Sequence, residues 1–250
     1  MSDVRSPLSQ VPANTFYTGL VADLYGPLKS TSFPVDPYRE LIRRFGHPAL
    51  ELGCGDGEPL LDLREEGLDV DGIDSSPDMI MRLRRRAAKR GVEVDAWVAS
   101  METMRLVRTY QTIFLVGPTF NLLPNDQAMA RALSRIEQVL ASDGTAVIPL
   151  FVPEPVSIDE IGVPTRQDTP TGWIGWHIVD AARNEEARTQ TLTLRYERVD
   201  GPEKETLERD WVIHWISFDM FTHLARKVGL RAVSSPRTID HQPKDVLLQH

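Results

Sequence analysis

The residues best suited to chemistry lie in a glycine-rich turn, Glu51-Leu52-Gly53-Cys54-Gly55-Asp56-Gly57. Glycines at such a turn let the backbone bend tightly and approach a ligand closely, near the start of a helix. The two acids, Glu51 and Asp56, suit hydroxyl and ammonium groups better than a pyrophosphate. The turn is also neither of the two common phosphate loops, because position 58 is Glu rather than Gly and no Gly-Lys-Ser/Thr follows.

A further acid, Asp74, stands at the end of the next predicted strand, 23 residues after Glu51. In a mononucleotide-binding βαβ unit, an acid about 20 residues beyond the glycine turn binds the ribose hydroxyls. The position of Asp74 fits that offset.

Residues 51–57 resemble the first motif of the class I S-adenosylmethionine-dependent methyltransferases, E/D-x-G-x-G-x-G, and Asp74 matches the second mark of that family. The resemblance covers about residues 14–151 and implies S-adenosyl-L-methionine as the methyl donor. After the third strand the family often has an acid that holds the adenine, where this sequence has Ser100. The donor-binding residues that the resemblance implies are Tyr17, Glu51, Gly53, Gly55, Asp74, Ser75, Met79, Ser100, Met101 and Val116.

Apolar periodicity predicts strands and helices in alternation between residues 47 and 151. The predicted strands are 47–52, 68–73, 92–98, 110–116 and 145–151, and the predicted helices are 58–66, 77–90 and 126–140. This order predicts an α/β fold, a doubly wound Rossmann-like sheet with helices on both faces; the family likeness implies seven strands. Two further helices, 14–25 and 37–45, precede it as an N-terminal lid, and Gly26-Pro27 is expected to end the first.

The pattern changes after Val152, where prolines, glycines and two tryptophans predict a long loop over residues 152–176. Segments 191–199 and 206–216 then alternate around Asp200-Gly201, which predicts a hairpin that completes the sheet or extends over the acceptor pocket. Ser217 is expected to cap a helix ending near residue 228, with strands at 231–234 and 245–248. We therefore expect one methyltransferase domain: tail and lid 1–46, donor core 47–151, a C-terminal β-rich insertion at 152–216, and a closing part 217–250.

Methyl transfer from a sulfonium requires alignment of donor and acceptor and exclusion of water, so it need not leave a conspicuous catalytic motif. The tyrosines Tyr17 and Tyr25 resemble those of the small-molecule branch, the glycine and aminosugar N-methyltransferases, in which an N-terminal helix covers the donor. The insertion is expected to supply the acceptor pocket, with Trp211 in its strand and His177 or His214 as candidate general bases. The predicted acceptor-binding residues are Tyr25, Phe120, Asn121, Trp173 and Trp176.

Composition restricts the partners. The net charge of −8 opposes general binding to nucleic acid, and the arginine-rich helix 77–90 is expected to be a solvated surface. The single cysteine, Cys54, excludes an internal disulfide and suits a reducing compartment. No signal-peptide pattern or apolar run of about 18 residues is present, so we expect a cytoplasmic protein that does not enter a membrane.

These observations favour a metal-independent methyltransferase acting on a small-molecule acceptor. An RNA or protein methyltransferase and a non-catalytic S-adenosylmethionine-binding protein stay open as alternatives. The exposed strands 191–216 could also pair two subunits in a homodimer.

Overall fold

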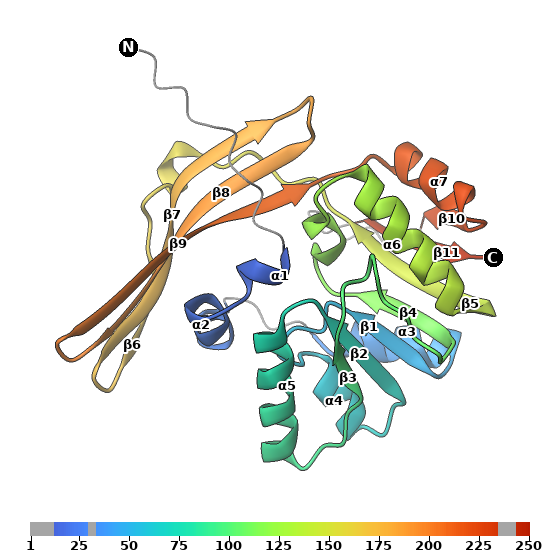
Figure 1. Cartoon of the computed structure of the whole chain (residues 1–250), viewed down its shortest axis with the longest axis horizontal. Helices are drawn as coiled ribbons and strands as arrows, with labels where there is room; N and C mark the ends of the chain where they lie inside the picture. Colours follow the sequence, from blue (N-terminus) through green and yellow to red (C-terminus); the bar gives the residue numbers. More distant parts are fainter. Residues whose placement is uncertain (1–12, 30–33, 235–243) are drawn as a thin grey trace.

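The computed structural model describes residues 13–29, 34–234 and 244–250. It contains a seven-stranded sheet of order β10-β11-β5-β4-β1-β2-β3 and a four-stranded sheet of order β6-β7-β8-β9 (Figure 1). The strands of the first sheet are β1 (Ala49–Leu52), β2 (Val70–Asp74), β3 (Ala96–Val98), β4 (Tyr110–Leu115), β5 (Leu140–Leu150), β10 (Arg231–Ser234) and β11 (Lys244–Gln249). The helices are α1 (Ala13–Phe16), α2 (Leu20–Leu28), α3 (Asp36–Phe45), α4 (Leu60–Glu65), α5 (Pro77–Arg90), α6 (Asp126–Val139) and α7 (Phe218–Lys227), with short 3-10 turns η1 (Thr119–Leu122) and η2 (Ile158–Glu160).

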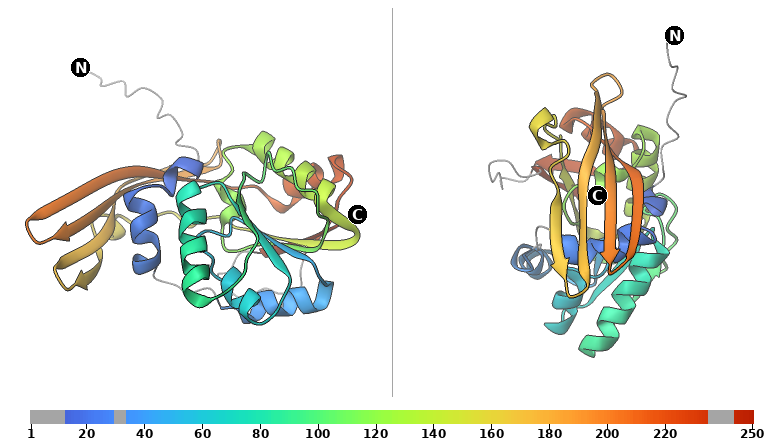
Figure 2. Two further views of the ribbon diagram at one scale, coloured as in Figure 1. Left: turned by 60° about the horizontal axis from the view of Figure 1, so that its bottom comes forward. Right: turned by 90° about the vertical axis from the view of Figure 1, so that its left-hand side faces the viewer.

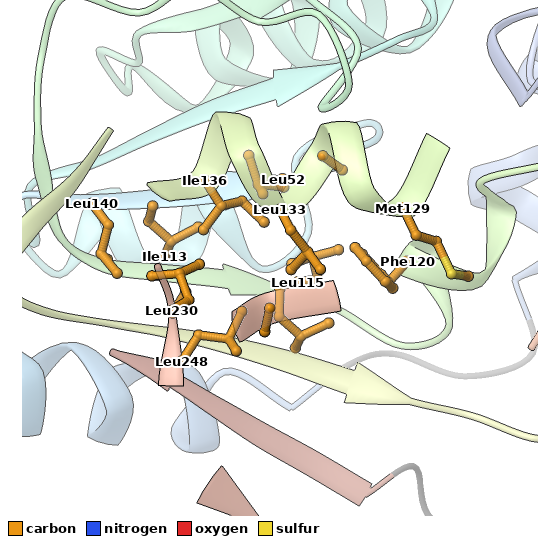
Figure 3. Packing of buried hydrophobic residues seen from close by; sticks show 14 of the residues in the cluster. Leu52, Ile113, Leu115, Phe120, Met129, Leu133, Ile136, Leu140, Leu230 and Leu248 are labelled. Carbon is orange, nitrogen blue, oxygen red and sulfur yellow. The ribbon is translucent and has the colours of Figure 1, made fainter. Parts of the chain in front are cut away.

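The first sheet has the predicted doubly wound arrangement. Strands β1 to β5 pair in parallel, while β11 runs antiparallel to both β5 and β10. One hydrophobic core packs α6 and α7 against the sheet, including Leu133, Ile136 and Phe221 (Figure 3). A second core packs α3, α4 and α5 against the other face, including Ile42, Leu61 and Leu83. The Rossmann-like seven-stranded fold is therefore confirmed, and β10 and β11 complete it.

Local signals set several helix ends as predicted. The Ser76 hydroxyl accepts a hydrogen bond from Met79 N at 3.2 Å at the start of α5, and Gly91 ends that helix with φ +69°. Ser217 caps α7 in the same way through Met220 N. The strand predicted for 145–151 begins earlier than expected, because Asp143 and Gly144 lie within the irregular first part of β5.

The second sheet comprises β6 (Thr165–Thr169), β7 (Gly172–Asn184), β8 (Thr189–Asp200) and β9 (Glu203–His214). The predicted hairpin at Asp200-Gly201 joins β8 to β9. The loop predicted for 152–176 was wrong at its end, because β6 and β7 form another hairpin there. Gly172 and Gly175 suggested a loop, but a Cβ at these positions would lie only 2.1 Å from Val199 O and 2.7 Å from Thr165 O. Glycine is needed here for close strand packing. The predicted hairpin belongs to this separate sheet and does not complete the first one.

The predicted lid helix is divided in two. Gly19 has φ +55° and separates α1 from α2, and α2 continues through Gly26 and Pro27 to Leu28. A proline one residue from the helix end removes a single hydrogen bond, so it does not stop the helix earlier. Both helices lie between the two sheets, and Phe16 and Val21 pack on the second one (Figure 2). In the described part of the chain, no helix has the length and apolar character needed to cross a membrane.

Candidate active site

A cavity of about 460 Å³ lies at the carboxyl edge of the parallel strands, between the first sheet, the lid helices and β9. This is the edge at which ligands bind in open α/β sheets. Three groups of residues line it. The strand edge contributes Gly53, Gly55, Asp74, Ser75, Met79, Ala99, Ser100, Met101 and Glu102; the lid contributes Phe16, Tyr17 and Tyr25; and the far side contributes Thr119, Leu122, Leu123, Pro124, Asn125, Asp210, Trp211 and Val212.

The glycine turn forms a narrow cradle on the floor of this cavity. Gly53 and Gly55 have φ of +77° and +53°, which β-carbon-bearing residues rarely adopt. A Cβ at Gly53 would lie 2.3 Å from Cγ2 of Thr119, so only glycine fits there. The turn therefore leaves room for a ligand to approach the backbone.

Asp74 is held at the end of β2 by two backbone donors. Gly55 N donates to its Oδ2 at 2.9 Å, and Ser76 N donates to its Oδ1 at 2.8 Å. Burial raises the pKa of Asp74, while these two hydrogen bonds oppose the rise and the nearby Asp56 adds to it. The side chain is thus fixed in one orientation with acceptor capacity left on each oxygen.

Glu51 lies within β1, fully buried, and neither of its carboxylate oxygens has a hydrogen-bond partner among the described residues. Burial raises its pKa to about 8, with Asp74 and Asp56 adding to the rise and Lys29 opposing it. A buried acceptor without a partner is unusual and calls for a ligand or a water molecule. Asp56 instead pairs with Arg86 at 2.5 Å.

Replacing Glu51 with Gln is expected to change the pH dependence of stability. Because the folded pKa is above the unfolded value, wild-type stability should fall as the pH rises from about 4.5 to about 8. The glutamine variant has no such titration, so its free energy of unfolding relative to wild type should rise through that window. Urea unfolding at pH 5 and pH 8.5 measures this difference, and equal differences at both pH values would contradict it.

The lid places an aromatic wall over the cavity. The rings of Phe16 and Tyr17 are 4.8 Å apart and those of Tyr17 and Tyr25 are 5.6 Å apart, both edge to face. Burial raises the pKa of Tyr17 to about 12, an effect that the adjacent Trp211 partly offsets. Tyr17 therefore stays neutral near pH 7, beside an indole contributed by a distant strand.

The structure brings most of the predicted donor residues together. Tyr17, Gly53, Gly55, Asp74, Ser75, Met79, Ser100 and Met101 all line the cavity, as does Tyr25. Glu51 and Val116 are buried and are not part of the lining surface.

The other predicted acceptor residues lie elsewhere. Phe120 is fully buried against Phe221, with ring centroids 5.6 Å apart. Asn121 donates to Phe151 O at 2.8 Å and His214 O at 3.0 Å, and so joins η1 to the second sheet. Neither side chain is part of the cavity lining.

Of the residues predicted within the insertion, Trp211 lines the cavity and the others do not. Trp173 stacks with Arg166, whose Cζ is 4.6 Å from the ring, and Trp176 packs with the leucines of α2. His177 faces Arg195 across the β7–β8 pair. His214 is buried with Nε2 3.5 Å from Asp126 Oδ1, and burial lowers its pKa.

The lining residues that had not been predicted are Phe16, Ala99, Glu102, Thr119, the segment Leu122–Asn125, Asp210 and Val212. The segment follows η1 directly, and its position after the fourth strand was the available signal. Asp210 and Val212 flank Trp211 on β9. They would have been found if the position of this strand beside the cavity had been known.

The match to known families agrees with this geometry. The family model described as "Methyltransferase domain" matches residues 49–144, the part that holds the glycine turn and Asp74. The chain therefore contains a methyltransferase domain, as the sequence motifs predicted.

Among curated proteins, a candidate methyltransferase of Geobacillus sp. (strain WCH70) is 25% identical over 113 residues. That alignment covers 45% of this chain and 46% of the relative, so it spans less than half the length of either protein.

Solved structures resemble the chain over nearly its whole length. A sugar N-methyltransferase from Streptoalloteichus sp ATCC 53650 has a TM-score of 0.77 and 15% identity, covering 100% of this chain and 99% of the other. An amino pentose methyltransferase from Micromonospora echinaspora has a TM-score of 0.70 and 18% identity, covering 92% and 97%. At such low identity the likeness shows a shared fold alone.

Proposed function

We propose that this protein transfers the methyl group of S-adenosylmethionine to an amine nitrogen of a small molecule, without a metal ion. The observation that carries the proposal is a single cavity with two unlike halves. One half holds the glycine cradle and Asp74, and the other holds Tyr17 and Trp211. The fold shared with the sugar N-methyltransferase and the amino pentose methyltransferase supports an aminosugar as the acceptor class.

The residues of the first half fit the donor. Asp74 would accept hydrogen bonds from the ribose hydroxyls, and Ser100 and Met101 would contact the adenine. The unpartnered carboxyl group of Glu51 would reach the ammonium group of the methionine part through a water molecule, because Glu51 itself does not line the cavity. The bound donor supplies an electrophilic methyl group on a sulfonium.

The residues of the second half would align the acceptor with that methyl group. The faces of Tyr17, Tyr25 and Trp211 present negative quadrupole charge that favours a cationic sulfonium or amine. Their bulk also excludes water from the reacting atoms, which favours in-line displacement. The donor half would fix one reactant while this aromatic wall orients the other.

Two features support a small molecule over a nucleic acid. The net charge is −8, and three arginines of the basic helix form ion pairs with acids of the fold. Arg82 pairs with Asp23, Arg86 with Asp56, and Arg90 with Asp62 and Glu65. Cytoplasmic location and homodimer formation stay predictions that follow from composition and from the exposed strands of the second sheet.

Isothermal titration of the purified protein with S-adenosylmethionine tests the proposal, with Gly55→Asp as the matched control. Asp tolerates a positive φ, and a Cβ at this position meets only the flexible end of Met79 at 3.4 Å, so the control should fold. We expect binding by wild type alone, and turnover in a radiolabelled methyl-transfer panel of aminosugars, amino acids and oligonucleotides. Absence of wild-type binding, or turnover on oligonucleotides only, would overturn the proposal.

A Trp211→Leu variant should separate the two halves of the cavity. Because Trp211 lies on the acceptor side, we expect the dissociation constant for S-adenosylhomocysteine to stay within about threefold of wild type. Loss of a desolvated cation–π contact of about 2 kcal/mol should lower kcat/KM for the amine acceptor by at least about tenfold. An unchanged kcat/KM would place the acceptor elsewhere.

A further inference from the structure

The turn that joins the two lid helices, residues 15–19, is bound on one side by an arginine of the second sheet. Arg209 of β9 places Nη1 within hydrogen-bonding distance of Thr15 O (2.6 Å), Thr18 O (3.0 Å) and Thr18 Oγ1 (2.9 Å), and it also contacts Phe16 O. A single guanidinium nitrogen thus lies among the carbonyl groups of residues 15, 16 and 18, to which its two hydrogens can donate. Trp211, which lies two positions after Arg209 on β9, lines the cavity.

The same turn is bound on its other side by the donor-binding half. Ser76 Oγ donates to Tyr17 O at 2.6 Å, and Gly19 N donates to Asp78 Oδ2 at 2.7 Å. Ser76 also donates its backbone N–H to Asp74. The turn is therefore connected through Ser76 to the carboxylate proposed to hold the ribose.

A second link lies one turn further along α2. Asp23 pairs with Arg82 of α5 and with Arg198 of β8, the latter at 3.1 Å. Both links join the lid to the donor half on one side and the second sheet on the other. The lid therefore cannot move without loss of contacts to both.

We propose that Arg209 is a positioning residue, which holds the lid turn over the donor and couples the second sheet to donor binding. This inference rests on the proposed function for the identity of the donor, but the clasp itself is a property of the free protein. When Arg209 is removed, the turn loses its partner on the acceptor side and should open more often. Tyr17 would leave the cavity during each opening, and bound donor or product would then escape faster.

Hydrogen exchange of the unliganded protein tests the clasp. In Arg209→Ala we expect the Gly19 amide to exchange at least about tenfold faster, although its acceptor is Asp78 and not Arg209. Arg209→Lys should recover part of the protection, because it retains a cation at the carbonyl groups. Arg195→Ala is the matched control, since Arg195 lies on the neighbouring strand and pairs with Glu208 instead of with the carbonyl groups of the lid turn. Core amides such as that of Leu50 report whether the whole fold has loosened.

Stopped-flow displacement of S-adenosylhomocysteine tests the coupling. The dissociation rate should rise at least about fivefold in Arg209→Ala, partly recover in Arg209→Lys, and stay at the wild-type value in Arg195→Ala. Unchanged Gly19 exchange, or equal acceleration at Leu50, would overturn the clasp. Faster exchange with an unchanged dissociation rate would overturn the coupling. If wild type does not bind S-adenosylhomocysteine at all, the proposed function fails, and the exchange data still decide the clasp.

Discussion

An Asp74→Ala variant is expected to bind S-adenosylmethionine at least about 100-fold more weakly than wild type. Hydrogen bonds to a charged group contribute about 1.5–3 kcal/mol each, and a ribose offers two hydroxyls to this carboxylate. A loss of about 3 kcal/mol corresponds to a factor of more than about 100 in the dissociation constant. The substitution also leaves Gly55 N and Ser76 N without the acceptor that orders the turn. The loss of affinity should therefore be at least this large.

Isothermal titration measures this change, and the control is Asp95→Ala. Asp95 is an exposed carboxylate just before β3, so it matches the charge change at a nearby position outside the cavity lining. We expect the control to bind within about twofold of wild type, because exposed charges contribute little at a distance in salt. Comparable affinities of the Asp74 variant and wild type would show that the ribose is held by other groups.

A Gly53→Ala variant is expected to lose about 3 kcal/mol of stability. The positive φ of +77° costs a Cβ-bearing residue about 1–2 kcal/mol, and the new Cβ would overlap Cγ2 of Thr119. Forced repacking of this kind typically adds about 1–3 kcal/mol. For a chain of 250 residues, the combined loss should lower Tm by about 6–12 °C in a thermal melt.

The double variant Gly53→Ala/Thr119→Ser separates strain from overlap. Serine removes only Cγ2 and retains Oγ1, which donates to Val116 O at 2.7 Å. We therefore expect the double variant to regain about half of the lost stability, with Thr119→Ser alone close to wild type. If the double variant were as unstable as the single one, the overlap would not contribute, and strain in the turn would explain the whole loss.

The local parts of this protein could be predicted from the sequence because their causes lie within a few residues. Residues 51–57 must bend sharply between a strand and a helix, and glycine is the residue that permits it. Ser76 and Ser217 cap their helices through amides three positions ahead. The position of Asp74 follows from the length of one βαβ unit. These short-range constraints determined the class of protein and the donor half of the site.

The acceptor side and the lid depended on contacts between distant segments, which only the tertiary structure decided. Gly172 and Gly175 suggested a loop in the sequence. They are in fact needed because the neighbouring strands approach closely at Val199 and Thr165, and the sequence around the glycines does not show this approach. Tyr17 and Trp211 form one wall although 194 positions separate them, because Arg209 binds the lid turn. The spacing of the arginines of α5 says nothing about the acids that α2 and α4 bring to them. A sequence pattern records which face of an element is apolar or charged, whereas the partner of that face follows from how the elements pack.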